Sequence, residues 1–132
     1  MPTAREEMIL RKLREICLAL PEVTETVTWD HPNFRVGEKI FCVMGGYEGT
    51  PNITIKVGKP LLEVFLKDPR FVLASHIGKH GWVSMQVAKG SLNWSEIASL
   101  CRDSYRRVAP ARLARQLDGS VGLRIGWRRA SE

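Results

Sequence analysis

Hydrophobic and polar residues alternate between residues 81 and 87, and the pattern then changes to a helical spacing. The alternation predicts a strand with one apolar face and one polar face. From residue 94 to residue 108, apolar positions recur every three or four residues, which predicts an amphipathic helix. Asn93 and Glu96 occupy the two positions of a capping box at the start of this helix. The apolar side of this strand and helix must be buried, whereas the polar strand face need not be.

Along the rest of the chain, the pattern predicts a first helix, four further strands and two short helices. Thr3 can cap a first helix over 3–20, and Pro21 ends it because a proline disfavours a helical residue before it. Alternation and apolar runs predict strands at 23–29, 34–36, 39–44 and 53–57, with short helices at 59–67 and 111–117. Between them we expect a turn at 30–33, a loop at 45–51 and a partly extended connection at 70–80.

This order of elements predicts an α+β fold, in which an antiparallel sheet carries both long helices on one face. The strand residues expected to meet the helices are Val27, Phe34, Val36, Ile53, Ile55, Val83, Met85 and Val87. The other face is expected to be open and to carry Thr24, Thr26, Thr28, Arg35, Thr54, Lys56, Trp82, Ser84 and Gln86. The length of 132 residues predicts one domain, assigned to 1–118, followed by a basic, flexible tail at 119–132.

The composition, 44% hydrophobic and 26% charged, is typical of a globular domain. No apolar run approaches the roughly 20 residues that span a bilayer, and the N-terminus lacks the apolar core of a signal peptide. A monomer in the cytoplasm, without membrane contact, is therefore expected. Cys17, Cys42 and Cys101 lie far apart in apolar segments, which indicates reduced, buried thiols. A metal or redox cluster is expected to show a closer spacing of its cysteines.

The net charge of +6 is concentrated toward the C-terminus. Residues 102–129 contain eight arginines and two aspartates, whereas residues 1–101 are nearly neutral. Arginine suits phosphate because its planar guanidinium donates two parallel hydrogen bonds. A phosphate-bearing partner is one interpretation of this bias, and a solvated helix surface is the other.

The sequence contains no arrangement typical of a catalytic site or of a cofactor site. His76 and His80 are four residues apart, but Gly78 lies between them and no third metal ligand follows at a usable spacing. Gly45 and Gly46 lack the strand–turn–helix context of a phosphate-binding loop. We therefore expect a protein without catalytic activity, metal or cofactor.

Five short motifs resemble the MmcQ/YjbR family in their order and spacing. They are Leu20-Pro21, Lys56, Lys79, Trp82-Val83 and Ser104-Tyr105. The resemblance extends over about residues 5–117 and implies a frataxin-like (CyaY-like) α+β fold. Family members are regarded as DNA-binding proteins with a double-wing arrangement, an assignment made from structure. Frataxin binds iron through an acidic first helix, whereas the first helix of this chain mixes acidic and basic residues, which argues against an iron site.

Two groups of residues are candidate binding sites. Nucleic-acid contacts are predicted for Lys56, Lys79, His80, Arg106, Arg107, Arg112 and Arg115. A ligand platform on the open sheet face is predicted for Arg35, Trp82, Ser84 and Gln86. The first group favours a non-catalytic DNA-binding protein of weak sequence specificity, because phosphate contacts carry no base information. The alternative is a small-molecule or protein-interaction module around Trp82, a residue that we expect a loop to cover in part.

Overall fold

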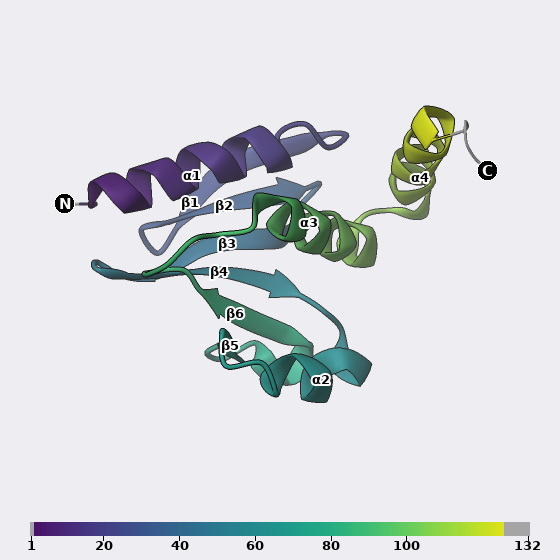
Figure 1. Cartoon of the computed structure of the whole chain (residues 1–132). Helices are drawn as coiled ribbons and strands as arrows, with labels where there is room; N and C mark the ends of the chain where they lie inside the picture. Colours follow the sequence, from purple (N-terminus) through teal and green to yellow (C-terminus); the bar gives the residue numbers. More distant parts are fainter. Residues whose placement is uncertain (1, 126–132) are drawn as a thin grey trace.

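The computed structural model describes residues 2–125, with side chains up to residue 118. Figure 1 shows the elements along the chain. The helices are α1 (Ala4–Cys17), α2 (Leu62–Leu66), α3 (Trp94–Val108) and α4 (Ala111–Ile125). The strands are β1 (Val23–Thr28), β2 (His31–Val36), β3 (Lys39–Tyr47), β4 (Thr50–Lys56), β5 (Phe71–Leu73) and β6 (Trp82–Gln86). Short 3₁₀ turns at Lys59–Leu61 and Gly78–His80 precede α2 and β6.

The strands form one antiparallel sheet in the order β1-β2-β3-β4-β6-β5. Two tight hairpins, β1–β2 and β3–β4, make up two thirds of it, and both of their turns lie at the same end of the sheet. The last two strands are antiparallel to each other and complete the sheet beside β4. The predicted α+β class is confirmed.

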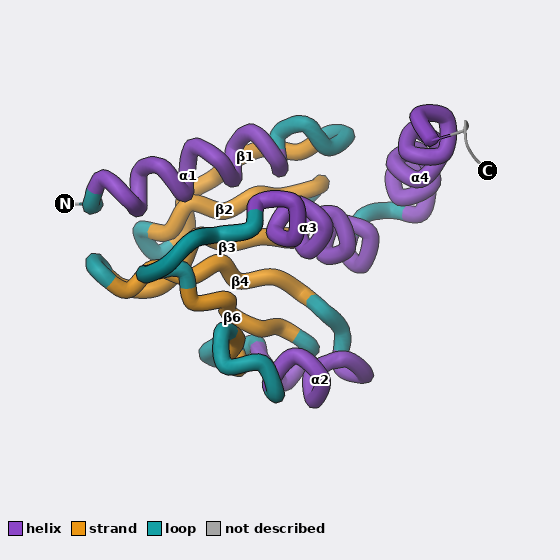
Figure 2. The backbone as a smooth tube through the Cα atoms, viewed as in Figure 1, coloured by secondary structure: helices purple, strands orange, loops and turns teal. Residues whose placement is uncertain are grey.

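Helices α1 and α3 lie on the same face of the sheet, in front of the strands in Figure 2. Helix α1 buries Ile9, Leu13 and Cys17, and α3 buries Ile97, Cys101, Ser104 and Tyr105. Seven of the eight strand residues expected to meet the helices are buried as well. The exception is Val27, which is 66% exposed on the edge strand β1, so the prediction for this residue is wrong.

Ser104 fastens α3 to the centre of the sheet. Its hydroxyl accepts a hydrogen bond from the backbone N–H of Lys56 at 2.9 Å and donates one to the carbonyl oxygen of Phe41. The register of β2 and β3 shifts beside Phe41, and both Phe41 and Cys42 are fully buried there. The serine therefore joins β3 to the end of β4 and satisfies two backbone groups that would otherwise lack partners. Tyr105 adds an edge-to-face contact with Phe41 and donates to the Pro21 carbonyl at 2.7 Å.

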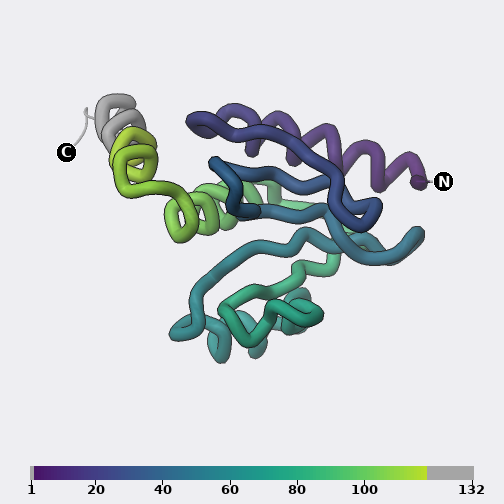
Figure 3. The backbone as a smooth tube through the Cα atoms, turned by 180° about the vertical axis from the view of Figure 1, so that it is seen from behind, coloured from purple at the N-terminus to yellow at the C-terminus, as the bar shows by residue number. Residues whose placement is uncertain are grey.

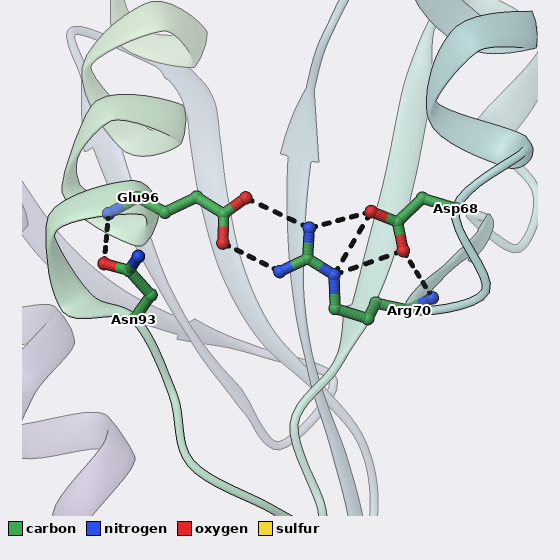
Figure 4. A network of polar contacts seen from close by, with 4 residues as sticks. All are labelled: Asp68, Arg70, Asn93 and Glu96. Atoms are coloured by element: carbon green, nitrogen blue, oxygen red, sulfur yellow. Dashed lines mark hydrogen bonds and ion pairs between the residues drawn. The ribbon is translucent and has the colours of Figure 1, made fainter.

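Polar side chains cap the N-termini of α1 and α3. Thr3 caps α1 as predicted, and together with Glu6 it forms a capping box. At α3, Asn93 accepts from the Glu96 N–H at 3.0 Å, as predicted, but the Glu96 carboxylate accepts two hydrogen bonds from Arg70. The same guanidinium also binds Asp68, so it ties the segment before β5 to α3 (Figure 4). Hydrogen bonds from Arg70 hold the pKa of both carboxyls below their ordinary values.

Two predicted connections belong to the hairpins. The turn consists of Trp29 and Asp30, which both adopt positive φ. The turn predicted at 30–33 is therefore wrong for residues 31–33, which belong to β2. Pro32 is tolerated there because the pairing of β2 with β3 begins only at Asn33. The loop expected at 45–51 is strand on both sides of a short turn. Gly46 has a φ of +88°, and a Cβ there would collide with the Thr50 carbonyl.

The connection expected at 70–80 contains the short strand β5, which adds a sixth strand to the sheet. The helix expected at 111–117 begins as predicted, with Leu113 and Leu117 buried, and continues to Ile125. The flexible tail predicted for 119–132 therefore falls partly on α4. Residues 126–132 lie outside the described part of the chain.

Candidate nucleic-acid interface on the open sheet face

The face of the sheet away from α1 and α3 is seen from behind in Figure 3. Hydroxyl and amide side chains at its centre bond to one another. Thr54 donates to the Asn52 amide oxygen at 2.9 Å. Thr54 on β4 is paired with Ser84 on β6, and their two hydroxyl oxygens are 2.7 Å apart. Thr54 and Ser84 are both buried although α1 and α3 lie on the other side of the sheet, and residues 74–77 line the same hollow. Polar atoms therefore form the floor of the open face.

A second polar chain extends across β1 and β2. The Arg35 guanidinium donates to the Thr26 hydroxyl at 3.0 Å and to the Glu38 carbonyl at 2.8 Å. Thr26 in turn donates to the Asn33 amide oxygen, and the amide nitrogen donates to the His31 carbonyl at 3.2 Å. Arg35 is therefore fixed along the sheet by neutral oxygens, so its positive charge is available to a ligand.

A hollow of about 700 Å³ opens above this floor, at the end of the sheet where the two hairpins turn. We call it the hairpin hollow; it is lined by Trp29, His31, Val43, Gly45, Gly46, Tyr47, Asn52, Thr54, Ala74, Ser75, His76, Ile77 and Ser84. Trp29 and Tyr47, at the tips of the two hairpins, are 89% and 86% exposed. Among the described residues, those that line this hollow include no Asp or Glu. Two large aromatic rings thus stand at the rim of an uncharged, polar-floored depression.

A second hollow of about 450 Å³ lies at the opposite end of the same face. We call it the cationic hollow; it is lined by Arg35, Glu38, Lys39, Ile40, Val43, Lys56, Ile77, Trp82 and Val108. Val43 and Ile77 border both hollows, so the two are adjacent. Three cations and one carboxylate surround the partly buried ring of Trp82. This end of the face is suited to an anion beside a flat group.

The helix side of the hairpin turns has the opposite charge. A hollow of about 600 Å³ there shares Trp29 and Tyr47 with the hairpin hollow. Its lining includes four acidic residues, Glu6, Glu7, Asp30 and Glu48. A phosphate group would be repelled from this side, because like charges at short range are unfavourable. The two sides of the hairpin turns thus differ in charge, and the helix side is the less favourable one for an anion.

The seven residues predicted to contact nucleic acid do not form one patch in the structure. Arg106 is paired with Asp103 at 2.8 Å and with Asp118 at 2.6 Å, and Arg112 is paired with Glu22 at 3.0 Å. Hydrogen bonds from Arg112 lower the pKa of Glu22. Lys79 and His80 are exposed on the 3₁₀ turn before β6 and line neither hollow of the open face.

The other three predicted cations differ in position. Lys56 lines the cationic hollow, and Arg107 lies beside Gly58, two residues beyond Lys56. Arg115 is exposed on α4. Lys56 and Arg107 thus mark one end of the sheet, whereas the charges of Arg106 and Arg112 are already paired.

The four residues of the predicted platform lie in three places. Arg35 and Trp82 share the cationic hollow, and Ser84 lies in the floor of the hairpin hollow. Gln86 is exposed near the β3–β4 turn and lines neither of them. The sequence analysis missed Trp29 and Tyr47, since Trp29 falls on the core face of an alternating strand. The signal that could have identified it is the adjacent Asp30, a residue favoured in turns.

The three cysteines, which are far apart in sequence, meet in the core. Their sulfurs lie within 4.8 Å of one another, and the Sγ atoms of Cys42 and Cys101 are 4.0 Å apart. All three side chains are fully buried and reduced, as predicted. Hydrogen bonds from Cys17 and Cys42 lower the pKa of Cys101. The same hydrogen bonds raise the pKa of Cys17 and of Cys42. Distance along the chain thus gives no argument against a thiol cluster.

An antiparallel sheet with helices on one face and a polar, hollowed surface on the other defines an α+β domain with a candidate binding surface on its open sheet face. The chain belongs to the YjbR family, whose family model matches residues 18–107. The described helices include none with the length and apolar character that a membrane span requires.

The fold is similar to the crystal structure of Deinococcus radiodurans protein DR2400, a DUF419 domain. The TM-score is 0.61 at 23% identity, and the similarity covers 75% of this chain and 77% of that one. At this identity the similarity establishes the fold alone. Comparison with curated protein sequences gives no match.

Proposed function

We propose that this protein is a non-catalytic DNA-binding protein whose open sheet face holds a single-stranded or locally unpaired segment. Trp29 and Tyr47 would stack on bases, and the cations of the cationic hollow would contact phosphates. The observation that carries the proposal is the high exposure of the two rings beside a hollow without carboxylates. Exposed rings beside a positively charged surface are typical of proteins that bind single strands.

The charge distribution supports the same proposal. Among the described side chains, the ion pairs of the structure include neither Arg35 nor Lys56, so phosphates need not displace a carboxylate from them. Base stacking and phosphate contacts both tolerate any sequence, so weak sequence specificity is proposed as well. No recognition helix enters into this mode of binding.

The test is an anisotropy titration of the full chain against a labelled single strand and the matching duplex, at about 50 and 200 mM salt. We expect tighter binding of the single strand, with an affinity that falls as salt rises. Substituting Trp29→Ala and Tyr47→Ala together should weaken binding at least thirtyfold, since each stacked base contributes roughly 1–3 kcal/mol. Val64→Ala, an exposed apolar residue on α2, is the matched control and should change little. Equal affinity of the double variant and wild type would refute the proposal.

A small-molecule function is the second candidate, because the hairpin hollow has the volume of a ligand pocket and a floor of bonded hydroxyls. A mononucleotide added to the same titration separates the two. If the mononucleotide binds as tightly as the strand, and salt has no effect, the small-ligand function replaces the DNA-binding one. A strand that binds much more tightly than the mononucleotide supports a polymer.

A further inference from the structure

Three different elements each bring one thiol to the same point in the core. Cys17 is the last residue of α1, Cys42 lies in β3, and Cys101 lies in the middle of α3. Each side chain is 0% exposed, and the three sulfurs lie within 4.8 Å of one another. The cluster is therefore placed between the sheet and the two helices that cover it, remote from the open face.

The spacing of the sulfurs suits a bound ion. A three-coordinate ion with metal–sulfur bonds of about 2.3 Å, arranged in a plane, places its ligands about 4.0 Å apart. The Cys42 and Cys101 sulfurs are separated by this distance already, at 4.0 Å. A disulfide requires a separation of about 2.05 Å, so two of the thiols would have to approach by about half their present distance. Metal binding thus requires a smaller movement than oxidation does.

The ligand set limits the kind of ion. Thiolates select soft ions such as Cu(I) and Zn(II), and a structural zinc site takes four ligands in a tetrahedron. Among the described residues, the group around these sulfurs contains only the three cysteines and no fourth His, Cys, Asp or Glu. Burial also excludes a ready supply of water as a fourth ligand. Three soft ligands without a fourth favour Cu(I), which accepts three-coordinate geometry.

We propose that Cys17, Cys42 and Cys101 form a buried three-sulfur site for one Cu(I) ion. Each thiol that binds as a thiolate releases its proton to solvent, no electron is transferred, and the affinity rises with pH. The ion would enter during folding or through a transient opening between α1 and α3. Because it would join α1, β3 and α3, the bound form should resist heat better than the free form.

The test uses the full, reduced chain in the absence of oxygen, titrated with Cu(I) against a coloured chelator. We expect one tightly bound ion per chain, a sulfur-to-copper absorption band in the ultraviolet, and a higher melting temperature. X-ray absorption of the wild-type complex should show three sulfurs at about 2.3 Å. Replacement of any one cysteine by alanine should lower the affinity at least hundredfold.

The wild-type spectrum decides the matter even if a cysteine variant fails to fold. Two sulfurs, or a mixture of sulfur and nitrogen ligands, would overturn the three-sulfur site. A site that holds Zn(II) in preference to Cu(I), with four ligands, would overturn the choice of ion. Equal affinity of the folded chain and the chain in denaturant would show that the fold does not build the site, and would also overturn the proposal.

Discussion

The two ends of the open sheet face are adjacent but differ in chemistry. The hairpin hollow has exposed aromatic rings, a floor of hydroxyls and no carboxylate among its lining residues. The cationic hollow is smaller and has Arg35, Lys39 and Lys56 around the half-buried Trp82. One end suits flat, uncharged groups, and the other suits anions.

A small ligand would need only one of these ends. A nucleic-acid strand has flat bases and anionic phosphates in alternation, so it could use both at once. The ends also differ in their support, because α3 lies beneath the cationic end and is fastened there by Ser104. The hairpin end holds its aromatic rings out at the turns. Substitutions at the cationic end should therefore lower stability, whereas substitutions at the hairpin end should weaken binding alone.

Removal of the Ser104 hydroxyl should give the largest effect. In Ser104→Ala the N–H of Lys56 and the carbonyl of Phe41 both lose their partner. We expect a loss of about 3 kcal/mol in the free energy of unfolding, since an unsatisfied buried polar group costs roughly 1–3 kcal/mol. Denaturant unfolding followed by circular dichroism measures it. Ser99→Ala, at an exposed position of the same helix, is the control and should change stability by less than about 0.5 kcal/mol.

The sequence reveals which residues of a helix are buried, but not which partners a buried polar residue such as Ser104 will have. Ile9, Leu13 and Cys17 are spaced four residues apart and all lie in the core, as the helical spacing of the first helix implies, because a helix packed on a sheet has one buried stripe. Ser104 is a polar residue on the same kind of stripe, and its partners come from two strands about 50 and 60 residues away. No local pattern encodes such a contact, because it depends on the tertiary arrangement of α3 over β3 and β4.

The candidate site was less accessible to prediction than the fold. Alternation assigns Val27 and Trp29 to the core side of β1, but it cannot show where the helix layer ends. Both residues are exposed because they lie near the turn of an edge hairpin. The clustering of the three cysteines could not be predicted either, because it too depends on the tertiary arrangement of α1, β3 and α3. Lys56 and Trp82, in contrast, lie on the open face as the alternation predicts: they pair across β4 and β6, and both line the cationic hollow.

The same substitution at two tryptophans separates the two ends most directly. Trp82→Ala should lower stability by about 2 kcal/mol, less than the roughly 3–5 kcal/mol of a fully buried ring, because Trp82 is only partly buried. Trp29→Ala should leave stability within about 0.5 kcal/mol of wild type, since its ring makes little contact with the fold. Thermal unfolding and strand binding are measured for both variants. Equal losses of stability would contradict the distinction between a supported and an unsupported end.

Neutralisation of the cationic end should change the salt dependence of binding. Arg35→Gln and Lys56→Gln together remove two proposed phosphate contacts. For single strands, each contact contributes about 0.7 to the slope of log affinity against log salt, so the slope should become shallower by about 1.4. Arg11→Gln, an exposed cation on α1, is the control and should leave the slope unchanged. An unaltered slope in the double variant would place the phosphates elsewhere.

The smallest predicted effect distinguishes two neighbouring arginines at the end of α3. Arg106 is held by Asp103 and Asp118, so its charge is balanced, whereas Arg107 lies beside Gly58 at the cationic end. Arg107→Gln should lower the salt slope by about 0.7, the contribution of one contact to a single strand. Arg106→Gln should leave the slope unchanged and cost less than about 1 kcal/mol in stability, because exposed ion pairs contribute little. If Arg106→Gln lowers the salt slope and Arg107→Gln does not, the nucleic-acid strand runs along the side of α3 that carries Asp103. The cationic hollow would then not contact the nucleic acid.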